Sequence, residues 1–184
     1  RTGSETYTVE QGGRTLSVPG SAGVAEASAD RLRTEIEGVR DRADVVVVQI
    51  HGGDEYQRRP TGTMRRLSEA AVDAGADLVV NHHPHVTGGF ERRNGAVIAW
   101  SLGNLVFDQV LWETLRSYVL VVHADADGVR RVMAERVVLD GYVPKGAAGA
   151  VRRTLSGDAA ALSTWSFRGG MAGGAGRDRA PERA

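Results

Sequence analysis

Residues 44–85 read DVVVVQIHGGDEYQRRPTGTMRRLSEAAVDAGADLVVNHHPH, and their pattern predicts the central part of the fold. It opens with a largely apolar run, Asp44 to Ile50, which is the pattern of a strand covered on both faces of a sheet. Residues 63–74 carry apolar side chains at helical spacing, and Gly75 is suited to end such a helix. Residues 77–80 form a second short apolar run. Strand, helix and strand in this order predict a right-handed βαβ unit with parallel strands. The apolar residues of the predicted helix are Met64, Leu67, Ala70, Ala71 and Ala74.

Upstream of this unit, the sequence predicts one more helix and a small hairpin. Apolar residues at helical spacing indicate a helix over residues 30–42, with Asp30 as its N-cap. The preceding segment, residues 1–29, is rich in small and polar residues and is expected to be mostly loop. Within it, residues 6–9 and 15–18 are candidate short strands around a Gly-Gly turn.

Downstream, the pattern predicts more strands and then a change of composition. A third strand is expected over residues 96–101. Residues 117–124 and 129–139 flank the turn sequence Asp-Ala-Asp-Gly and predict a hairpin. We therefore expect an α/β domain over residues 30–145, a helical extension over 146–168, and a disordered, Gly-rich tail over 169–184.

Composition narrows the class of protein. The 184 residues suffice for one domain with a core, and 23 basic residues balance 23 acidic ones, so no nucleic-acid partner is expected. Cysteine is absent, which excludes disulfides, thiolate nucleophiles and Cys-ligated zinc. No apolar stretch approaches the ~18 residues that span a bilayer, so we expect no membrane segment in this chain. Because the chain begins with Arg1, we expect it to derive from a longer polypeptide.

Four of the five histidines lie where they could bind a metal. His51 ends the first apolar run, and His82, His83 and His85 follow the second. In open α/β sheets, sites form beyond the carboxyl ends of parallel strands. In an extended chain His83 and His85 point to the same side, and Pro84 stiffens the segment between them. Three imidazoles suit zinc, iron, manganese or nickel, and such an ion polarises a phosphoryl or carbonyl oxygen and activates bound water.

The remaining polar candidates are weaker. His82 should face away from its neighbour, which favours a supporting role or a contact with phosphate. Asn104 follows a glycine and is either a turn former or, with His82, a candidate catalytic residue. His123 is expected to be a surface residue. Asp54 and Glu55 could bind metal or simply solvate a loop. The arginine pairs at 58–59, 65–66 and 92–93 could grip an anionic substrate, although a solvated surface is the commoner role.

Three segments together resemble a known family. They are VVVQIHGGDEY at 46–56, DAGADLVVNHHPHV at 73–86 and SLGNLVFDQ at 101–109. In order and spacing they are similar to the CapA family of poly-γ-glutamate capsule proteins, a branch of the calcineurin-like metallophosphoesterases. The resemblance implies a four-layer αββα sandwich with two divalent metal ions, of manganese, iron, zinc or nickel. His51 matches the family's late single histidine, and His83 and His85 match its closing pair.

The resemblance also includes departures. Asn81 stands where the family usually has glycine, and Gly52 stands where it more often has tryptophan. The family's early Gly-Asp and Asn-His elements, which supply further ligands, are not found. The chain is therefore expected to be the C-terminal half of the sandwich, and to bind metal weakly on its own.

The functional expectation follows from the resemblance. It implies a metal-dependent phosphoesterase of poly-γ-glutamate or cell-envelope polymer metabolism, acting on an anionic polymer or phosphoester at the cell surface or membrane. The alternative is a catalytically incomplete fragment, or a non-catalytic accessory subunit of a capsule-polymer synthesis complex.

Overall fold

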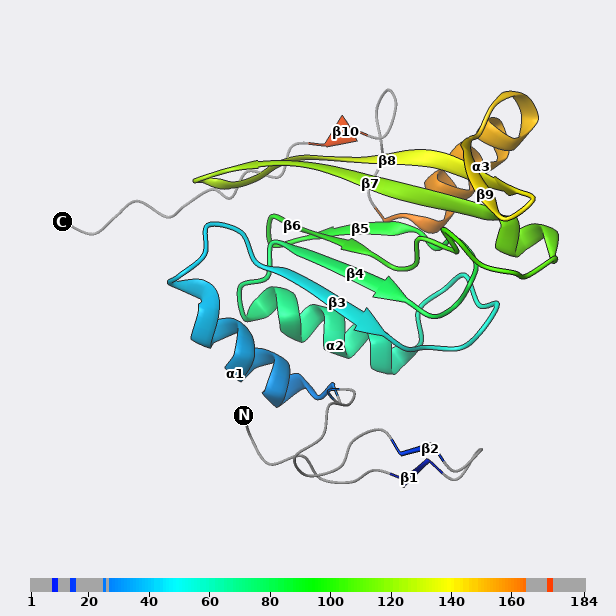
Figure 1. Ribbon diagram of the computed structural model, residues 1–184. Helices are drawn as coiled ribbons and strands as arrows, with labels where there is room; N and C mark the ends of the chain where they lie inside the picture. Colours follow the sequence, from blue (N-terminus) through cyan, green and yellow to red (C-terminus); the bar gives the residue numbers. More distant parts are fainter. Residues whose placement is uncertain (1–7, 10–13, 16–24, 26, 165–171, 174–184) are drawn as a thin grey trace.

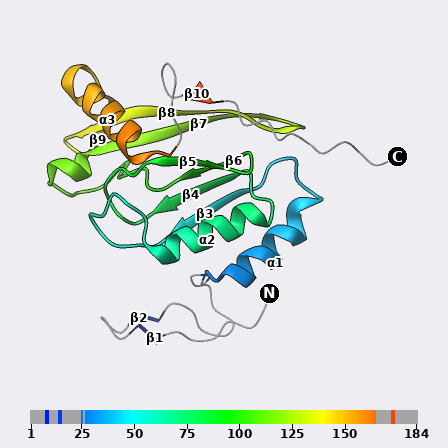
Figure 2. The same cartoon turned by 180° about the vertical axis from the view of Figure 1, so that it is seen from behind.

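Two β-sheets face each other, and two helices cover the outer side of the first sheet (Figures 1 and 2). The computed structural model describes residues 8–9, 14–15, 25, 27–164 and 172–173. The first sheet has the order β3-β4-β6-β5. Its strands are β3 (Val47–His51), β4 (Leu78–His82), β5 (Phe90–Arg93) and β6 (Ala96–Ala99). The covering helices are α1 (Ala29–Arg40) and α2 (Gly62–Asp73).

The second sheet is built on a long hairpin. Its main strands are β7 (Arg116–Asp125) and β8 (Gly128–Asp140), and β8 also pairs with β9 (Val143–Gly146) and β10 (Ala172–Gly173). A 3-10 turn, η1 (Trp112–Leu115), leads into β7, and α3 (Gly149–Leu162) follows β9. Near the N-terminus, β1 (Thr8–Val9) pairs with β2 (Arg14–Thr15) in antiparallel fashion.

Alternation along the strands of the first sheet divides the core in two. On β4, Val79 packs toward the helices, whereas Leu78 and Val80 pack toward the second sheet. On β6, Ile98 and Val97 alternate in the same way. Because successive strand residues face opposite sides, both faces of β4 are buried and the strand is held in register from above and below.

The predicted βαβ unit is confirmed, with one correction. β3 and β4 are parallel neighbours, α2 connects them, and Gly75 follows the helix with a φ of +112°. β3, however, is not covered on both faces as its apolar run suggested. It lies at the edge of the first sheet, and Val47 is 49% exposed on the side toward the second sheet.

Other expectations are corrected in detail. The N-cap of α1 is Ser28, whose side chain accepts a hydrogen bond from the Arg31 backbone N–H, and Asp30 lies in the first turn. β5 was not predicted, although Asn94 and Gly95 form its turn to β6 with positive φ angles of 50° and 82°. β9 was also missed.

The ends of the chain are only partly described. The N-terminal hairpin pairs at residues 8–9 and 14–15, close to the predicted strands. The expectation of a disordered tail falls mostly outside the described residues, but Ala172–Gly173 within it pairs with β8 as a strand. The α/β class is confirmed, and the four-layer sandwich stays a prediction. None of the helices in the described residues is long and apolar enough to cross a membrane.

An ion pair fixes the start of both parallel strands. The Arg40 guanidinium lies 2.6 Å from Asp77 Oδ2, and the same oxygen accepts a hydrogen bond of 2.8 Å from the Val46 backbone N–H. The Asp77 side chain is only 8% exposed. This carboxylate thus joins the end of α1 to the residues that precede β3 and β4.

Replacing Asp77 by alanine should therefore destabilise the fold. Loss of the carboxylate leaves Arg40 and the Val46 N–H without this acceptor, which should lower the free energy of unfolding by about 3 kcal/mol. Urea unfolding followed by circular dichroism measures the change. Asp140→Ala serves as control, because its ion pair with Lys145 is solvent-exposed and should contribute nothing measurable. Equal effects of the two substitutions would contradict the assignment.

Candidate functional site

The site begins where the parallel strands β3 and β4 end. The register places His51 opposite His82. Two backbone hydrogen bonds then join the loops that follow: the Gly52 N–H donates to His82 O over 3.1 Å, and the Tyr56 N–H donates to Pro84 O over 2.8 Å. The histidines of both loops are thereby brought to the same end of the sheet.

His51 and His83 converge most closely. His51 Nε2 lies 3.2 Å from His83 Nδ1, and the two rings meet edge to face with centroids 5.1 Å apart. Two nitrogen ligands at about 2.0–2.1 Å from one tetrahedral ion stand roughly 3.3 Å apart. The spacing of these nitrogens therefore fits two ligands of one ion, and the neutral imidazole is the right donor for it.

His85 is turned toward Asn104, and the hydrogen bonds define its tautomer. Asn104 Nδ2 donates to the Thr114 carbonyl over 3.2 Å, which places the amide oxygen toward the histidine. That oxygen lies 2.8 Å from His85 Nδ1. Because an amide oxygen only accepts, Nδ1 carries the proton and Nε2 keeps its lone pair. This is the arrangement by which an outer partner orients a metal-binding imidazole.

The backbone of the histidine segment differs from the expectation. His83 and His85 have positive φ angles of 106° and 61°, so the segment after β4 is a sequence of bends and not extended chain. Their rings are 6.0 Å apart, and each turns to a different partner. Such φ values are costly for residues with a side chain and are found where the surrounding structure holds them for function.

His82 lines the same cavity as His51, His83 and His85, so the expectation that it points away from His83 and His85 is wrong, but it contacts a different partner. Its Nε2 lies 3.2 Å from Gln49 Oε1 on the neighbouring strand, so His82 does not join His51 and His83. His123, in contrast, is exposed on β7.

A cavity of about 620 Å³ lies beside the histidines, between the two sheets. Phe107 packs on His85 with ring centroids 4.8 Å apart, and Tyr56 lies 6.3 Å from the same ring. Gln109 donates to the Tyr56 hydroxyl over 3.2 Å and accepts from Asn104 over 3.0 Å. The sequence reasoning missed Tyr56, Phe107 and Gln109 as site residues, although all three lie in the segments that carry the family resemblance.

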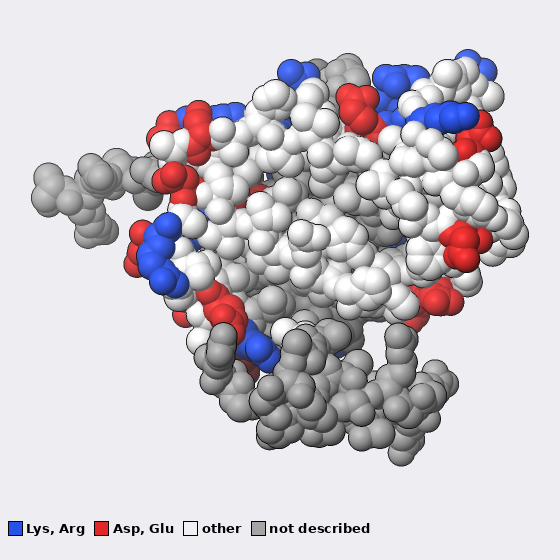
Figure 3. Space-filling view, viewed as in Figure 1, with Lys and Arg blue, Asp and Glu red and all other residues white. Residues whose placement is uncertain are grey.

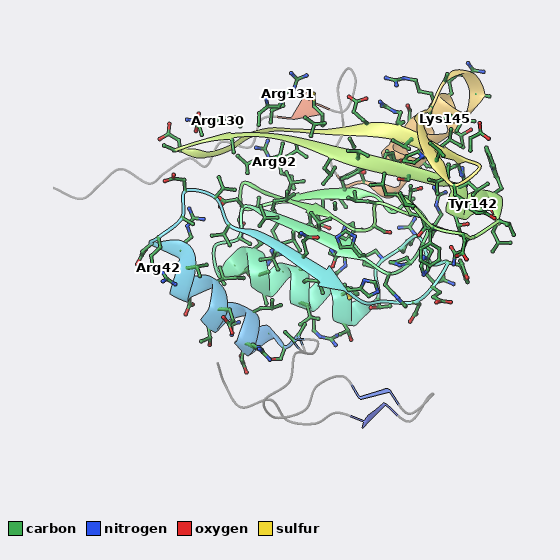
Figure 4. The ribbon with its side chains drawn as sticks, viewed as in Figure 1. Arg42, Arg92, Arg130, Arg131, Tyr142 and Lys145 are labelled. Atoms are coloured by element: carbon green, nitrogen blue, oxygen red, sulfur yellow. The ribbon has the colours of Figure 1, made fainter. Side chains whose placement is uncertain are left out.

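The arginines near the site pair with carboxylates of the protein and do not line the cavity. The described residues that line the cavity include no Arg or Lys. Arg58, Arg65 and Arg93, one from each arginine pair, are engaged with carboxylates of the protein. Figure 4 places Arg42 and Arg130 toward the end of the sheets where β3 begins, away from the histidines. The face with the edges of β3 and β7 is largely uncharged at its centre (Figure 3).

The described residues do not form a complete metal cage. Within the described ranges, no three His, Asp or Glu side chains are grouped closely enough to hold an ion as they stand. Asp54 and Glu55 are exposed in the loop after β3. The geometry thus provides a convergent pair of imidazoles and a third that is oriented beside it.

The two departures from the family pattern have structural explanations. Asn81 is 1% exposed on the helix side of β4, where its amide donates to Ser68 Oγ and to the Ala99 carbonyl over 3.1 Å each. A Cβ atom on Gly52 would meet Met64 Sδ at 3.1 Å, so the methionine fills the space beside this glycine. Both departures concern the packing beneath the loops and leave the histidines in place.

Comparison with known proteins defines the class. The family model for bacterial capsule synthesis protein PGA_cap matches residues 3–109, and the chain belongs to this family. It is 43% identical over 109 residues to the PGA biosynthesis protein CapA of Bacillus subtilis (strain 168), covering 59% of this chain and 29% of the relative. It is 40% identical over 114 residues to the capsule biosynthesis protein CapA of Bacillus anthracis, covering 60% of this chain and 27% of the relative. The chain thus spans less than a third of the length of either relative.

The electrostatics of the site predict a pH-dependent stability. Desolvation lowers the pKa of His51 below its ordinary 6.5, and the neighbouring His83 and His85 lower it further. Burial, and then His51, lower the pKa of His82. As the pH falls below 6.5, the unfolded chain takes up these protons before the folded one does. Stability is therefore present above that pH and is lost as the pH falls through the folded-state pKa.

This effect is measured by urea unfolding at about pH 7.5 and about pH 5.5, a window above the titration of ordinary carboxyl groups. The wild-type midpoint should decrease at the lower pH, and His51→Gln should reduce the decrease. His123→Gln, which alters an exposed histidine on β7 that does not line the cavity, should leave it unchanged. A loss that persists in full in His51→Gln would argue against the site as its source.

Proposed function

We propose that the chain carries the histidine half of a metal-dependent phosphoesterase site. The observation that carries the proposal is the 3.2 Å approach of His51 Nε2 and His83 Nδ1, with His85 Nε2 left free by the bond of Nδ1 to Asn104. These three residues would hold the metal. A bound divalent ion would supply Lewis acidity and a more acidic water molecule.

Other residues of the site have distinct proposed roles. Asn104 orients His85 and fixes its tautomer, so its role is positioning. His82 is held by Gln49 at the mouth of the cavity and could donate a hydrogen bond to a phosphoryl oxygen. Phe107 packs against the His85 ring at a tilted angle and would limit access of water to that side of it. Because no Arg or Lys is among the described residues of the cavity wall, attraction for an anion would come from metal charge and imidazole N–H groups.

We also propose that further metal ligands come from polypeptide outside this chain, completing a site for two ions. β3 and β7 are edge strands of their sheets in the described structure, and Val119 and Val121 on β7 are each 37% exposed. Open edges of this kind accept additional strands. The relatives contain ample further length for such a segment.

The biological setting is proposed from the relatives. Both relatives are named for capsule or PGA biosynthesis. We infer that this chain takes part in poly-γ-glutamate or cell-envelope polymer metabolism at the cell surface or membrane, with an anionic polymer or phosphoester as substrate. A second candidate is a non-catalytic accessory subunit of a capsule-synthesis complex. It is favoured by the absence of a complete ligand cluster among the residues that the structure describes.

Metal binding provides the direct test. Isothermal titration of the chain with Mn²⁺ or Zn²⁺ should show saturable binding, and His83→Ala should weaken it about tenfold or more, because one of two convergent donors is lost. His123→Ala removes an exposed histidine on β7 and is the matched control. Binding that is equally strong in His83→Ala, or equally weakened by His123→Ala, would exclude the assigned ligands.

Activity separates the two candidate functions. A longer protein that includes the upstream polypeptide of a CapA relative should hydrolyse a chromogenic phosphodiester only with metal present, and His83→Ala should abolish this hydrolysis. Metal binding without hydrolysis in the longer protein would favour the accessory role.

A further inference from the structure

Helix α3 lies outside the family match but is joined to the histidine site by a shared carboxylate. Asp158 Oδ2 on α3 is 2.6 Å from Arg58 Nη2 and 3.1 Å from Arg116 Nη1. The family match ends at residue 109, so Asp158 belongs to a part of the chain that the match does not include. The three side chains come from the loop after β3, the start of β7 and the middle of α3.

Arg58 connects this carboxylate to the histidine loop. Its Nε donates to the Thr87 carbonyl, and its Nη2 donates to Thr87 Oγ1, each over 3.1 Å. Thr87 is 1% exposed and follows His85 by two positions. It also forms a β-bridge with Leu102, two positions before Asn104. The Arg58 guanidinium therefore binds the point at which the loop of His85 meets the loop of Asn104.

Arg116 supports the second of these loops. A Cβ atom on Gly103 would lie 2.6 Å from the Arg116 carbonyl oxygen, so the two backbones are in direct contact. The Tyr118 N–H donates to the Leu102 carbonyl over 2.8 Å. The start of β7 is thus packed against the residues that lead to Asn104.

The residues that follow α3 contact the end of the loop between β4 and β5. Ser163 Oγ accepts a hydrogen bond of 2.8 Å from the Phe90 N–H, and the Thr164 N–H donates to the Phe90 carbonyl over 3.2 Å. A Cβ atom on Gly89 would lie only 2.1 Å from the Leu162 carbonyl oxygen, so no larger residue fits there. The loop between β4 and β5 is therefore linked to α3 at Thr87 through Arg58 and Asp158, and the strand that follows it begins at Phe90, which is bonded to the two residues after α3.

The charges explain why the carboxylate is required. The Asp158, Arg116 and Arg58 side chains are 21%, 8% and 30% exposed, so the pairs are partly shielded from water. The hydrogen bond to Asp158 is the largest cause that raises the pKa of Arg58. Without the carboxylate, the two partly buried guanidinium groups would lose the oxygen that both of them contact and would repel each other.

We propose that Asp158 is a positioning residue, which through Arg58 and Arg116 fixes the loops that hold His85 against Asn104. The proposal rests on the proposed function only for the use of His85 as a ligand. The positioning itself is a statement about the two loops and can be tested without metal.

Hydrogen exchange measured by mass spectrometry tests the positioning. In Asp158→Asn, which keeps the side-chain volume, exchange should become at least about tenfold faster in peptides covering residues 85–90 and 101–105, with peptides from β4 and α2 unchanged. Asp158→Glu, which keeps the charge, should restore slow exchange at least in part. Asp140→Asn removes a solvent-exposed carboxylate and is the control.

A double variant tests whether Asp158 acts through Arg58. If Asp158 acts by separating the two cations, Arg58→Gln combined with Asp158→Asn should not exceed the effect of the more severe single change. Uniformly faster exchange across the chain, or additive effects in the double variant, would overturn the proposal.

Metal titration adds an independent readout. Asp158→Asn should weaken Mn²⁺ binding about tenfold, as expected for a change beyond the ligands. If the wild-type chain binds no metal, the ligand assignment fails, whereas the exchange data still decide the role of Asp158. If exchange is unchanged in Asp158→Asn, the positioning role fails whatever the metal result.

Discussion

Parallel pairing of β3 with β4 is the constraint on which the site depends. It places the last residues of both strands, His51 and His82, side by side, and the loops that follow must leave the sheet at the same end. The pairing is secured by burial of both faces of β4 and, at the opposite end, by the bonds of Asp77 to Arg40 and to the Val46 N–H. A shift of one residue would turn His51 toward the helices and Ile50 toward the cavity.

The register and two backbone hydrogen bonds bring the loops together, and the positive φ angles of His83 and His85 then orient their imidazoles. An extended segment after β4 would send His83 and His85 along the same direction. The left-handed backbone at both residues instead divides them, one toward His51 and the other toward Asn104. The hydrogen bonds of Tyr56 to Pro84 and of Arg58 to Thr87 are tertiary contacts that oppose relaxation of this segment. The strained conformation of the histidine loop is thus held by hydrogen bonds from the loop that follows β3.

The sequence sufficed for those parts of the fold that local patterns govern. Apolar runs, helical spacing and Gly75 predicted β3, α2 and β4 and their parallel order, because burial in a sheet demands such patterns. It misjudged β3 as fully covered, since an apolar run does not reveal whether a neighbouring strand is present. It also missed β5, whose sequence Phe-Glu-Arg-Arg is too polar to suggest a strand, although Asn94-Gly95 is a good turn.

For the candidate site, the sequence selected residues that the fold brings together, but it did not predict how they pair. His51, His83, His85 and Asn104 were all selected from their positions after strands or within the family motifs, and all lie at one end of the first sheet. Their pairing depends on positive φ angles and on contacts with α3, which are tertiary properties. No local signal connects Asp158 with a histidine loop more than 70 residues earlier. The orientation of His85 therefore depends on α3, a segment outside the motif that contains this histidine. For that reason the link between Asp158 and the histidine loop is visible only in the folded chain.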